Sequence, residues 1–379
     1  MMEAAPKKVL LVATVQCHIC QFHRPLARVL HQLGYEVHVA ACDNLAQKDG
    51  MQLDFADRVF DIPFARSPLS LTNIKAYRML KRLIDEQGYQ IVHCNTPVGG
   101  VLARLACRKL RKKGMRVLYT AHGFHFYKGA PILNWMLYYP IEWLCAHWTD
   151  RLITITDEDE VLARAKFKTE VKRIHSVGAD SGKFFPISSE KKAELRKQYG
   201  VEPDTAAILC VAELNKNKNQ KTAISAMAQV VKECPNAVLY LAGNGSEKET
   251  LQTQIRDLQL TDHVKLLGYT TKVADWFGIS DIVVACSLRE GLGMNVIEGM
   301  LCQKPVVASS NRGHRELVAN GETGYLVAPE DADAFALRLI ALLQSQELAK
   351  AMGLAGQKRA EKYTDINVER ELMEIYRGL

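Results

Sequence analysis

The sequence predicts an α/β protein made of two Rossmann-like domains that face each other across a cleft. Strand-like and helix-like segments alternate in both halves, and the strands are almost continuously apolar, which indicates parallel sheets covered on both faces. With 379 residues, the chain is too long for one ordinary core and suits two domains. We expect the first domain to span residues 1–183 and the second to span residues 184–363.

Each element follows from apolar periodicity. In the first half we expect strands at residues 9–14, 36–41, 58–62, 91–94, 116–121 and 151–156, with helices near 22–33, 73–86 and 98–113. Residues 176–186 lose this periodicity and contain two glycines and a proline, so they predict the interdomain linker. In the second half we expect strands at 206–211, 237–242, 264–267, 282–285 and 306–308. Ligands of such folds bind beyond the carboxyl ends of strands, so the loops that follow strands hold the candidate site.

The bulk composition is that of a globular protein that does not span a membrane. Hydrophobic residues make up 48% and charged residues 24%, and no run of 18 uncharged apolar residues occurs. The first eight residues lead directly into a strand and lack the apolar region of a signal peptide. The ten cysteines are scattered through apolar segments, as is usual for reduced core residues. We therefore expect a cytoplasmic protein.

The stretch from Ser287 to Met300 combines a strand end, a glycine-bearing loop and a helix start. The loop carries Glu290, and Glu298 lies about one turn into the helix. A helix start preceded by glycines exposes backbone N–H groups that suit a phosphate. Two carboxylates beside such a start could accept hydrogen bonds from sugar and ribose hydroxyls, which favours a nucleotide-sugar. The alternative is that both are ordinary solvated acids.

Three other loops follow strands and offer polar groups. Lys216 and Lys218 could neutralise a diphosphate, although a solvated turn would also contain such residues. Gly243 and Gly245 form a G-x-G pair, which is equally consistent with a tight turn. His122 could act as a base or hydrogen-bond a sugar hydroxyl, whereas a single histidine is more often structural.

Several of these motifs resemble those of the retaining glycosyltransferases of family 4, in the bacterial subgroup that builds capsule, exopolysaccharide and lipid-linked glycans. The resemblance rests on the E-x7-E spacing of Glu290 and Glu298, on His122-Gly-Phe-His125, and on residues 92–100 and 213–220. It implies the GT-B fold, with residues 364–379 crossing back to pack on the first domain.

The resemblance also implies an activity. A sugar would pass from a nucleotide-sugar, such as a UDP-N-acetylhexosamine, to a polyprenyl-diphosphate-linked sugar or another glycan, with retained anomeric configuration. No Asp-x-Asp triplet lies near the loops of Lys218 and Gly293, so we expect a metal-independent enzyme that needs no cofactor. Two alternatives stay open: a UDP-sugar epimerase on a similar two-domain fold, and a non-catalytic nucleotide-sugar-binding subunit.

The resemblance assigns roles to particular residues. It makes Glu290, His122 and Lys218 catalytic. The donor side would comprise Lys216, Gly243, Gly245, Tyr269, Gly291, Leu292, Gly293, Met294, Asn295 and Glu298. The acceptor side would comprise His18, His93, Asn95 and His125, with the first three just beyond strands of the first domain. Glu213 stands where the family usually has arginine, and Gln16-Cys17-His18 replaces its usual Gly-Gly pair.

The segment from Cys17 to Cys20, with His23 close by, could be a redox pair or half of a metal site. No second ligand pair at metal spacing stands out in the sequence. We therefore expect a thiol-containing loop after the first strand, and no bound metal.

The net charge of +7 is concentrated in one run. Seven cations without an intervening acid lie between Arg104 and Arg116, interleaved with leucines at helical spacing. A basic amphipathic helix suggests an anionic membrane surface, and a solvated surface helix is the alternative. An aromatic-rich segment from Trp135 to Trp143 fits contact with lipid or acceptor, or a place in the core. We expect peripheral attachment to the inner face of the cell membrane and, because no nucleic-acid motif occurs, no nucleic-acid partner.

Overall fold

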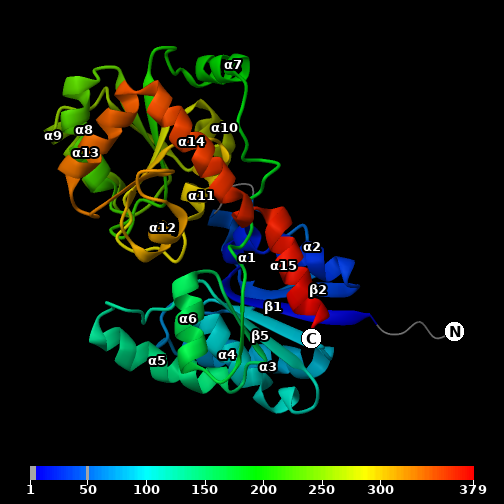
Figure 1. The fold of residues 1–379 in the computed structure, drawn as a ribbon. Helices are drawn as coiled ribbons and strands as arrows, with labels where there is room; N and C mark the ends of the chain where they lie inside the picture. Colours follow the sequence, from blue (N-terminus) through cyan, green and yellow to red (C-terminus); the bar gives the residue numbers. More distant parts are fainter. Residues whose placement is uncertain (1–5, 48–50) are drawn as a thin grey trace. The chain divides into compact units, whose positions relative to one another are not determined.

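The computed structural model describes residues 6–47 and 51–379, and contacts divide the chain into two compact units. Unit 1 is Met1–Gly178 with Asp365–Leu379, and unit 2 is Ala179–Thr364. Each unit is a parallel sheet with helices packed on it (Figure 1). The predicted fold class of two Rossmann-like α/β domains is therefore confirmed.

Unit 1 is built on a seven-stranded sheet in the order β3-β2-β1-β4-β5-β6-β7. Its elements are β1 (Lys7–Val15), α1 (Gln16–Phe22), α2 (Arg24–Gln32), β2 (Tyr35–Cys42), η1 (Leu45–Gln47), β3 (Arg58–Asp61), α3 (Thr72–Gln87), β4 (Ile91–Asn95), α4 (Pro97–Arg111), β5 (Arg116–Ala121), α5 (Ile132–Ala146), β6 (Arg151–Thr154), α6 (Asp157–Lys166), β7 (Glu170–Arg173) and α15 (Asp365–Arg377). The strand order reverses between β1 and β4, whose residues pair from Val9 with Ile91 to Val12 with Cys94. In doubly wound sheets such a reversal opens a crevice at the carboxyl ends.

Unit 2 is built on a six-stranded sheet in the order β10-β9-β8-β11-β12-β13. Its elements are α7 (Ser189–Tyr199), β8 (Ala206–Val211), α8 (Gln220–Glu233), β9 (Ala237–Ala242), α9 (Lys248–Asp257), β10 (Val264–Gly268), α10 (Val273–Ile279), β11 (Ile282–Ala285), α11 (Met294–Leu301), β12 (Val306–Ser309), α12 (Arg312–Leu317), β13 (Gly324–Val327), α13 (Ala332–Gln344), α14 (Gln346–Ala360) and η2 (Glu361–Tyr363). Here the order reverses between β8 and β11.

The last helix, α15, belongs to unit 1. It packs beside α2 (Figure 1), and Arg28 of α2 binds Asp365 at 2.8 Å and Glu369 at 2.5 Å. On the sheet side, the Tyr376 hydroxyl lies 2.5 Å from Nδ1 of His93 in β4. The chain therefore returns to its first unit at its end.

The sequence predicts that all the cations of the basic run lie on the surface of a helix, but one of them does not. Arg104 is buried, and its guanidinium donates to both carboxylate oxygens of Glu142 on α5 at 2.8 and 3.1 Å. It also stacks 3.9 Å over the ring of Tyr119. Arg104 shares the helix face of buried Ala103 and Cys107, and its partner lies 38 residues further along the chain. The prediction that Arg104 contributes to a basic surface is therefore wrong.

The rest of the run is divided between paired and exposed cations. Arg111 binds Asp150 at 2.9 Å, and Arg116 lies 3.8 Å from the same carboxylate. The exposed cations outside these ion pairs are Arg108, Lys109, Lys112 and Lys113. The aromatic-rich segment forms α5, which has two faces. Trp135, Tyr138 and Tyr139 pack against the core, whereas the exposed side chains are Ile132, Leu133, Met136, Leu137, Ile141, Trp143 and Leu144. In the described part of the chain, no helix has both the length and the apolar character needed to cross a membrane.

The Arg104–Glu142 pair predicts a measurable stability difference. Glu142→Gln leaves the Arg104 guanidinium buried without its counter-charge, which should lower the free energy of unfolding by about 3–5 kcal/mol. The exposed Arg82–Glu86 pair on α3 is the matched control, and Glu86→Gln should leave stability nearly unchanged. Urea denaturation monitored by circular dichroism measures both, and equal effects would contradict the role of the buried pair.

Candidate functional site

The strongest candidate site of unit 2 lies where the strand order reverses. The loop after β8 and the loop after β11 meet there through main-chain and side-chain hydrogen bonds. The Leu288 N–H donates to the Asn217 carbonyl at 2.7 Å, and the Asn217 amide donates to the Arg289 carbonyl at 3.0 Å. Asn219, buried at the start of α8, donates to the Cys286 carbonyl at 3.2 Å. The two loops therefore form one structure.

An ion pair crosses between these loops. Lys218 Nζ lies 2.5 Å from Glu290 Oε1, and the side chains are only 25% and 14% exposed. Burial alone would raise the pKa of Glu290, but the Lys218 charge and hydrogen bonds from Lys218 and Ser287 hold it below its ordinary value. Glu290 is therefore a carboxylate at neutral pH, and Lys218 is a cation held at the carboxyl ends of β8 and β11.

The start of α11 adjoins this pair. Gly293 caps the helix with a φ of +105°, and no side chain caps it. A Cβ on Gly293 would lie 3.0 Å from the ring of His314, so glycine is favoured by both conformation and space. Asn295 donates to the Val211 carbonyl at the end of β8, at 3.1 Å. The helix thus directs uncapped N–H groups toward the edge where Lys218 lies, an arrangement that suits an anion.

Glu298 lies one turn into α11 and differs electrostatically from Glu290. Its burial raises the pKa of the carboxyl to about 8, which Lys183 opposes only weakly. At neutral pH the Glu298 carboxyl is therefore mostly protonated. Hydroxyl groups that donate to this side chain would favour its ionised form, so Glu298 is suited to bind a diol such as a ribose.

The remaining residues predicted for the donor side differ in burial and in packing. A Cβ on Gly243 would lie 2.0 Å from the Ala212 carbonyl oxygen, and one on Gly245 would lie 2.1 Å from that of Leu214. The G-x-G pair therefore has a structural reason, because it packs directly on the loop after β8. Tyr269 directly follows β10, and Leu292 is buried beside α12, whereas Lys216 and Glu213 are exposed. No ion pair with Lys216 is found in the described part of the chain.

His314 is a site residue that the sequence analysis missed. It is fully buried on α12 against Gly293, and its Nε2 has no hydrogen-bond partner among the described residues. Its Nδ1 lies 2.9 Å from the Ser309 carbonyl, and burial lowers its pKa although Glu290 opposes the shift. Its position shortly after β12, near the carboxyl end of that strand, is the signal that could have identified it.

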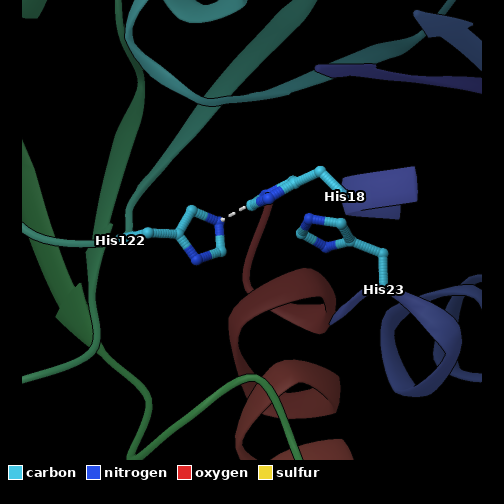
Figure 2. A group of neighbouring side chains, drawn as sticks. All are labelled: His18, His23 and His122. Atoms are coloured by element: carbon cyan, nitrogen blue, oxygen red, sulfur yellow. Dashed lines mark hydrogen bonds between the residues drawn. The ribbon is translucent and has the colours of Figure 1, made fainter. Parts of the chain in front are cut away.

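In unit 1 the predicted residues gather at the corresponding reversal. His18 is on α1 directly after β1, Asn95 ends β4, and His122 follows β5. His122 Nε2 lies 3.4 Å from His18 Nε2 (Figure 2). It also lies 3.2 Å from the Asn95 amide oxygen. Burial lowers the pKa of His122 to about 4 and that of His18 well below its ordinary value, so both rings are neutral. Both line a cavity of about 330 Å³, together with His125, which stacks on Tyr138.

Two predictions for unit 1 differ from the structure: the place of His93, and the conformation of the segment after β1. His93 lies within β4 rather than beyond it, is 1% exposed, and has both ring nitrogens engaged, by Tyr376 and by Thr120 at 2.7 Å. No exposed ring atom is left to meet an acceptor. The expected thiol-containing loop is the helix α1, in which Cys17 is buried and receives a hydrogen bond from Asn44.

Comparison with known proteins places both units in known families. The family model described as "Glycosyl transferase 4-like" matches residues 8–156, and that described as "Glycosyl transferases group 1" matches residues 191–359.

Individual relatives match nearly the whole chain. The protein EpsD of Bacillus subtilis (strain 168), which is named as a glycosyltransferase, is 43% identical over 98% of this chain and 96% of its own. A UDP-Gal:alpha-D-GlcNAc-diphosphoundecaprenol alpha-1,3-galactosyltransferase of Escherichia coli is 26% identical over 80% of each chain. Among solved structures, Anabaena Alr3699/HepE in complex with UDP and glucose superimposes with a TM-score of 0.80 at 20% identity, covering 98% of this chain and 100% of its own.

The raised pKa of Glu298 predicts a pH dependence of stability. The folded carboxyl keeps its proton up to about pH 8, whereas the unfolded one loses it near its ordinary value of 4.5. The stabilisation is complete below about pH 4 and is lost as the pH rises through 8. The urea midpoint should therefore fall between about pH 5 and about pH 8.5 more steeply than in Glu298→Gln. Parallel curves for the two proteins would contradict a buried, protonated carboxyl.

Proposed function

The chain belongs to the glycosyltransferases of family 4, which have the GT-B fold and are here of the exopolysaccharide and lipid-linked glycan type, and we propose that it is a retaining, metal-independent enzyme that uses a UDP-sugar. The donor would be a UDP-sugar such as a UDP-N-acetylhexosamine, and the acceptor a polyprenyl-diphosphate-linked sugar. The observation that carries this proposal is the Lys218–Glu290 ion pair beside the start of α11. Two relatives support the substrates: Anabaena HepE was solved with UDP-glucose, and the E. coli relative is named for a diphosphoundecaprenol acceptor.

The donor diphosphate would bind between Lys218 and the N-terminus of α11. In the free protein Glu290 neutralises Lys218, and the phosphate oxygens would supply negative charge in its place. Glu290 would then accept hydrogen bonds from the donor sugar, and Glu298 from the ribose. His122 of unit 1, which is neutral, would hydrogen-bond a sugar hydroxyl without adding charge.

In the transfer step, the bond between the anomeric carbon and the phosphate oxygen breaks, and its electron pair leaves with UDP. The acceptor hydroxyl oxygen bonds that carbon from the same face, and its proton passes to the leaving phosphate. Lys218 and the α11 N–H groups stabilise the charge that develops on the diphosphate. No protein nucleophile is needed on this route, and the anomeric configuration is retained.

Incubation with labelled UDP-sugars, with and without a bacterial lipid extract, tests this function. We expect label in the lipid fraction only when the extract is present. An epimerase would convert the donor without extract, and a binding subunit would change nothing; either result would contradict the proposal.

Lys218→Ala should lower the transfer rate roughly 10- to 150-fold, the equivalent of a charge-assisted contact of about 1.5–3 kcal/mol. Lys221→Ala, three residues away and 64% exposed, is the matched control and should retain the rate.

We further propose that unit 1 attaches the enzyme to the inner face of the cell membrane. The exposed cations Arg108, Lys109, Lys112 and Lys113 lie at the C-terminal end of α4. The neighbouring α5 exposes a row of large apolar side chains, among them Ile132 at 78% and Met136 at 67%. The buried Arg104–Glu142 pair joins the two helices. Exposed apolar residues beside exposed cations are the combination that binds an anionic lipid surface.

Sedimentation with anionic liposomes checks this attachment. The protein should sediment at about 0.1 M salt and be released at about 1 M, where the Debye length falls from about 10 Å to about 3 Å. Changing Arg108, Lys109, Lys112 and Lys113 to glutamine should abolish binding. The matched control changes four exposed lysines of unit 2, Lys197, Lys232, Lys248 and Lys350, and should bind like the unmodified protein. Equal loss in both variants would contradict a local surface on α4.

A further inference from the structure

Three histidine rings converge in unit 1, and the proposed transfer uses only one of them, His122. His18 comes from α1, His23 from the turn between α1 and α2, and His122 from the segment after β5 (Figure 2). Each ring offers one nitrogen, and the three nitrogens lie within 4.8 Å of one another. The sequence placed His18 on the acceptor side and His23 beside the cysteines, and nothing in it connects either residue to His122.

The separation of the rings fits a shared metal ion. His18 Nε2 and His122 Nε2 are 3.4 Å apart, which is long for a hydrogen bond. Two imidazole nitrogens bound tetrahedrally at about 2.0–2.1 Å from zinc would lie about 3.3–3.4 Å apart. The two rings are nearly perpendicular, at 86°, so an edge of one points at the other rather than stacking on it. Only a small shift would therefore place both nitrogens on one ion.

A second observation comes from His23 itself. The residue is 3% exposed, and its Nε2 has no hydrogen-bond partner among the residues that the structure describes. A buried polar atom without a hydrogen-bond partner is energetically unfavourable. The centroid of the His23 ring lies 5.3 Å from that of His18 and 5.7 Å from that of His122. A purely hydrogen-bonded network of His18, His122 and Asn95 leaves this nitrogen unexplained, whereas a metal ion would use it.

We propose that His18, His23 and His122 form a binding site for a divalent metal ion that prefers imidazole ligands, with Zn²⁺ as the representative. Three imidazoles with a fourth position left open form a recognised arrangement for this class of ion. The cavity of about 330 Å³ borders His18 and His122 and offers space for the fourth ligand and a path for the ion. The nearby thiols take no part in this site. Cys17 Sγ accepts a hydrogen bond from the Asn44 amide, and Cys20 is not among the side chains whose ligand atoms converge.

Such an ion would inhibit transfer rather than assist it. A His122 ring bound to metal cannot hydrogen-bond a sugar hydroxyl, so occupation of the site would remove that contact. This consequence rests on the proposed function of His122, whereas the binding of the ion does not.

Binding of Zn²⁺ alone can be measured without substrate. Untagged, chelator-stripped protein is titrated with zinc in competition with a chromogenic chelator. We expect one equivalent to bind, with at least about a tenfold loss of affinity in His18→Gln and in His23→Gln. Zinc should also raise the melting temperature of the unmodified protein but not of these variants. His147→Gln, an exposed histidine of the same unit, is the matched control and should bind like the unmodified protein.

Absence of stoichiometric zinc binding would overturn the proposal, and so would unchanged affinity in both variants. His18 is partly exposed, so His18→Gln keeps the test decisive if His23→Gln fails to fold. The transfer assay then separates the two claims. Inhibition by zinc that a chelator reverses would support both, whereas zinc that binds the three histidines without slowing transfer would support the site and contradict the role of His122.

Discussion

The ion pair between Lys218 and Glu290 is the interaction on which the proposed donor site depends. It joins the loops after β8 and β11, which are already connected by hydrogen bonds from Leu288, Asn217 and Asn219. Glu290 therefore holds the Lys218 side chain in place and balances its charge before any substrate arrives, and the uncapped start of α11 adds N–H groups at the same edge of the sheet.

The two units use one topology for different chemistry. Both place polar side chains at the carboxyl ends of the strands where the sheet order reverses. In unit 2 that edge carries a cation and a helix N-terminus, which suits a diphosphate. In unit 1 the same edge carries neutral rings, His18 and His122, beside a cavity, which suits uncharged hydroxyls. The division of donor and acceptor roles in our proposal follows from this contrast in charge.

Local patterns in the sequence were enough to predict the fold class and the positions of the loops after β8 and β11. Apolar runs identified the central strands, and glycines before an amphipathic stretch identified the start of α11. The short strand β7, whose sequence is Glu-Val-Lys-Arg, was missed because it lacks an apolar run. The burial of Arg104, the packing of His314 against Gly293 and the meeting of His18 with His122 all depend on partners far along the chain, which periodicity cannot reveal.

A crystal structure of the protein grown with UDP would test the central claim most directly. The account predicts that the diphosphate lies in contact with Lys218 Nζ and with backbone N–H groups at the start of α11, and that the ribose hydroxyls meet Glu298. Lys218 should then bind phosphate oxygen in addition to, or instead of, Glu290. Density for UDP elsewhere in unit 2, or in unit 1 beside His122, would contradict the assignment of the donor site.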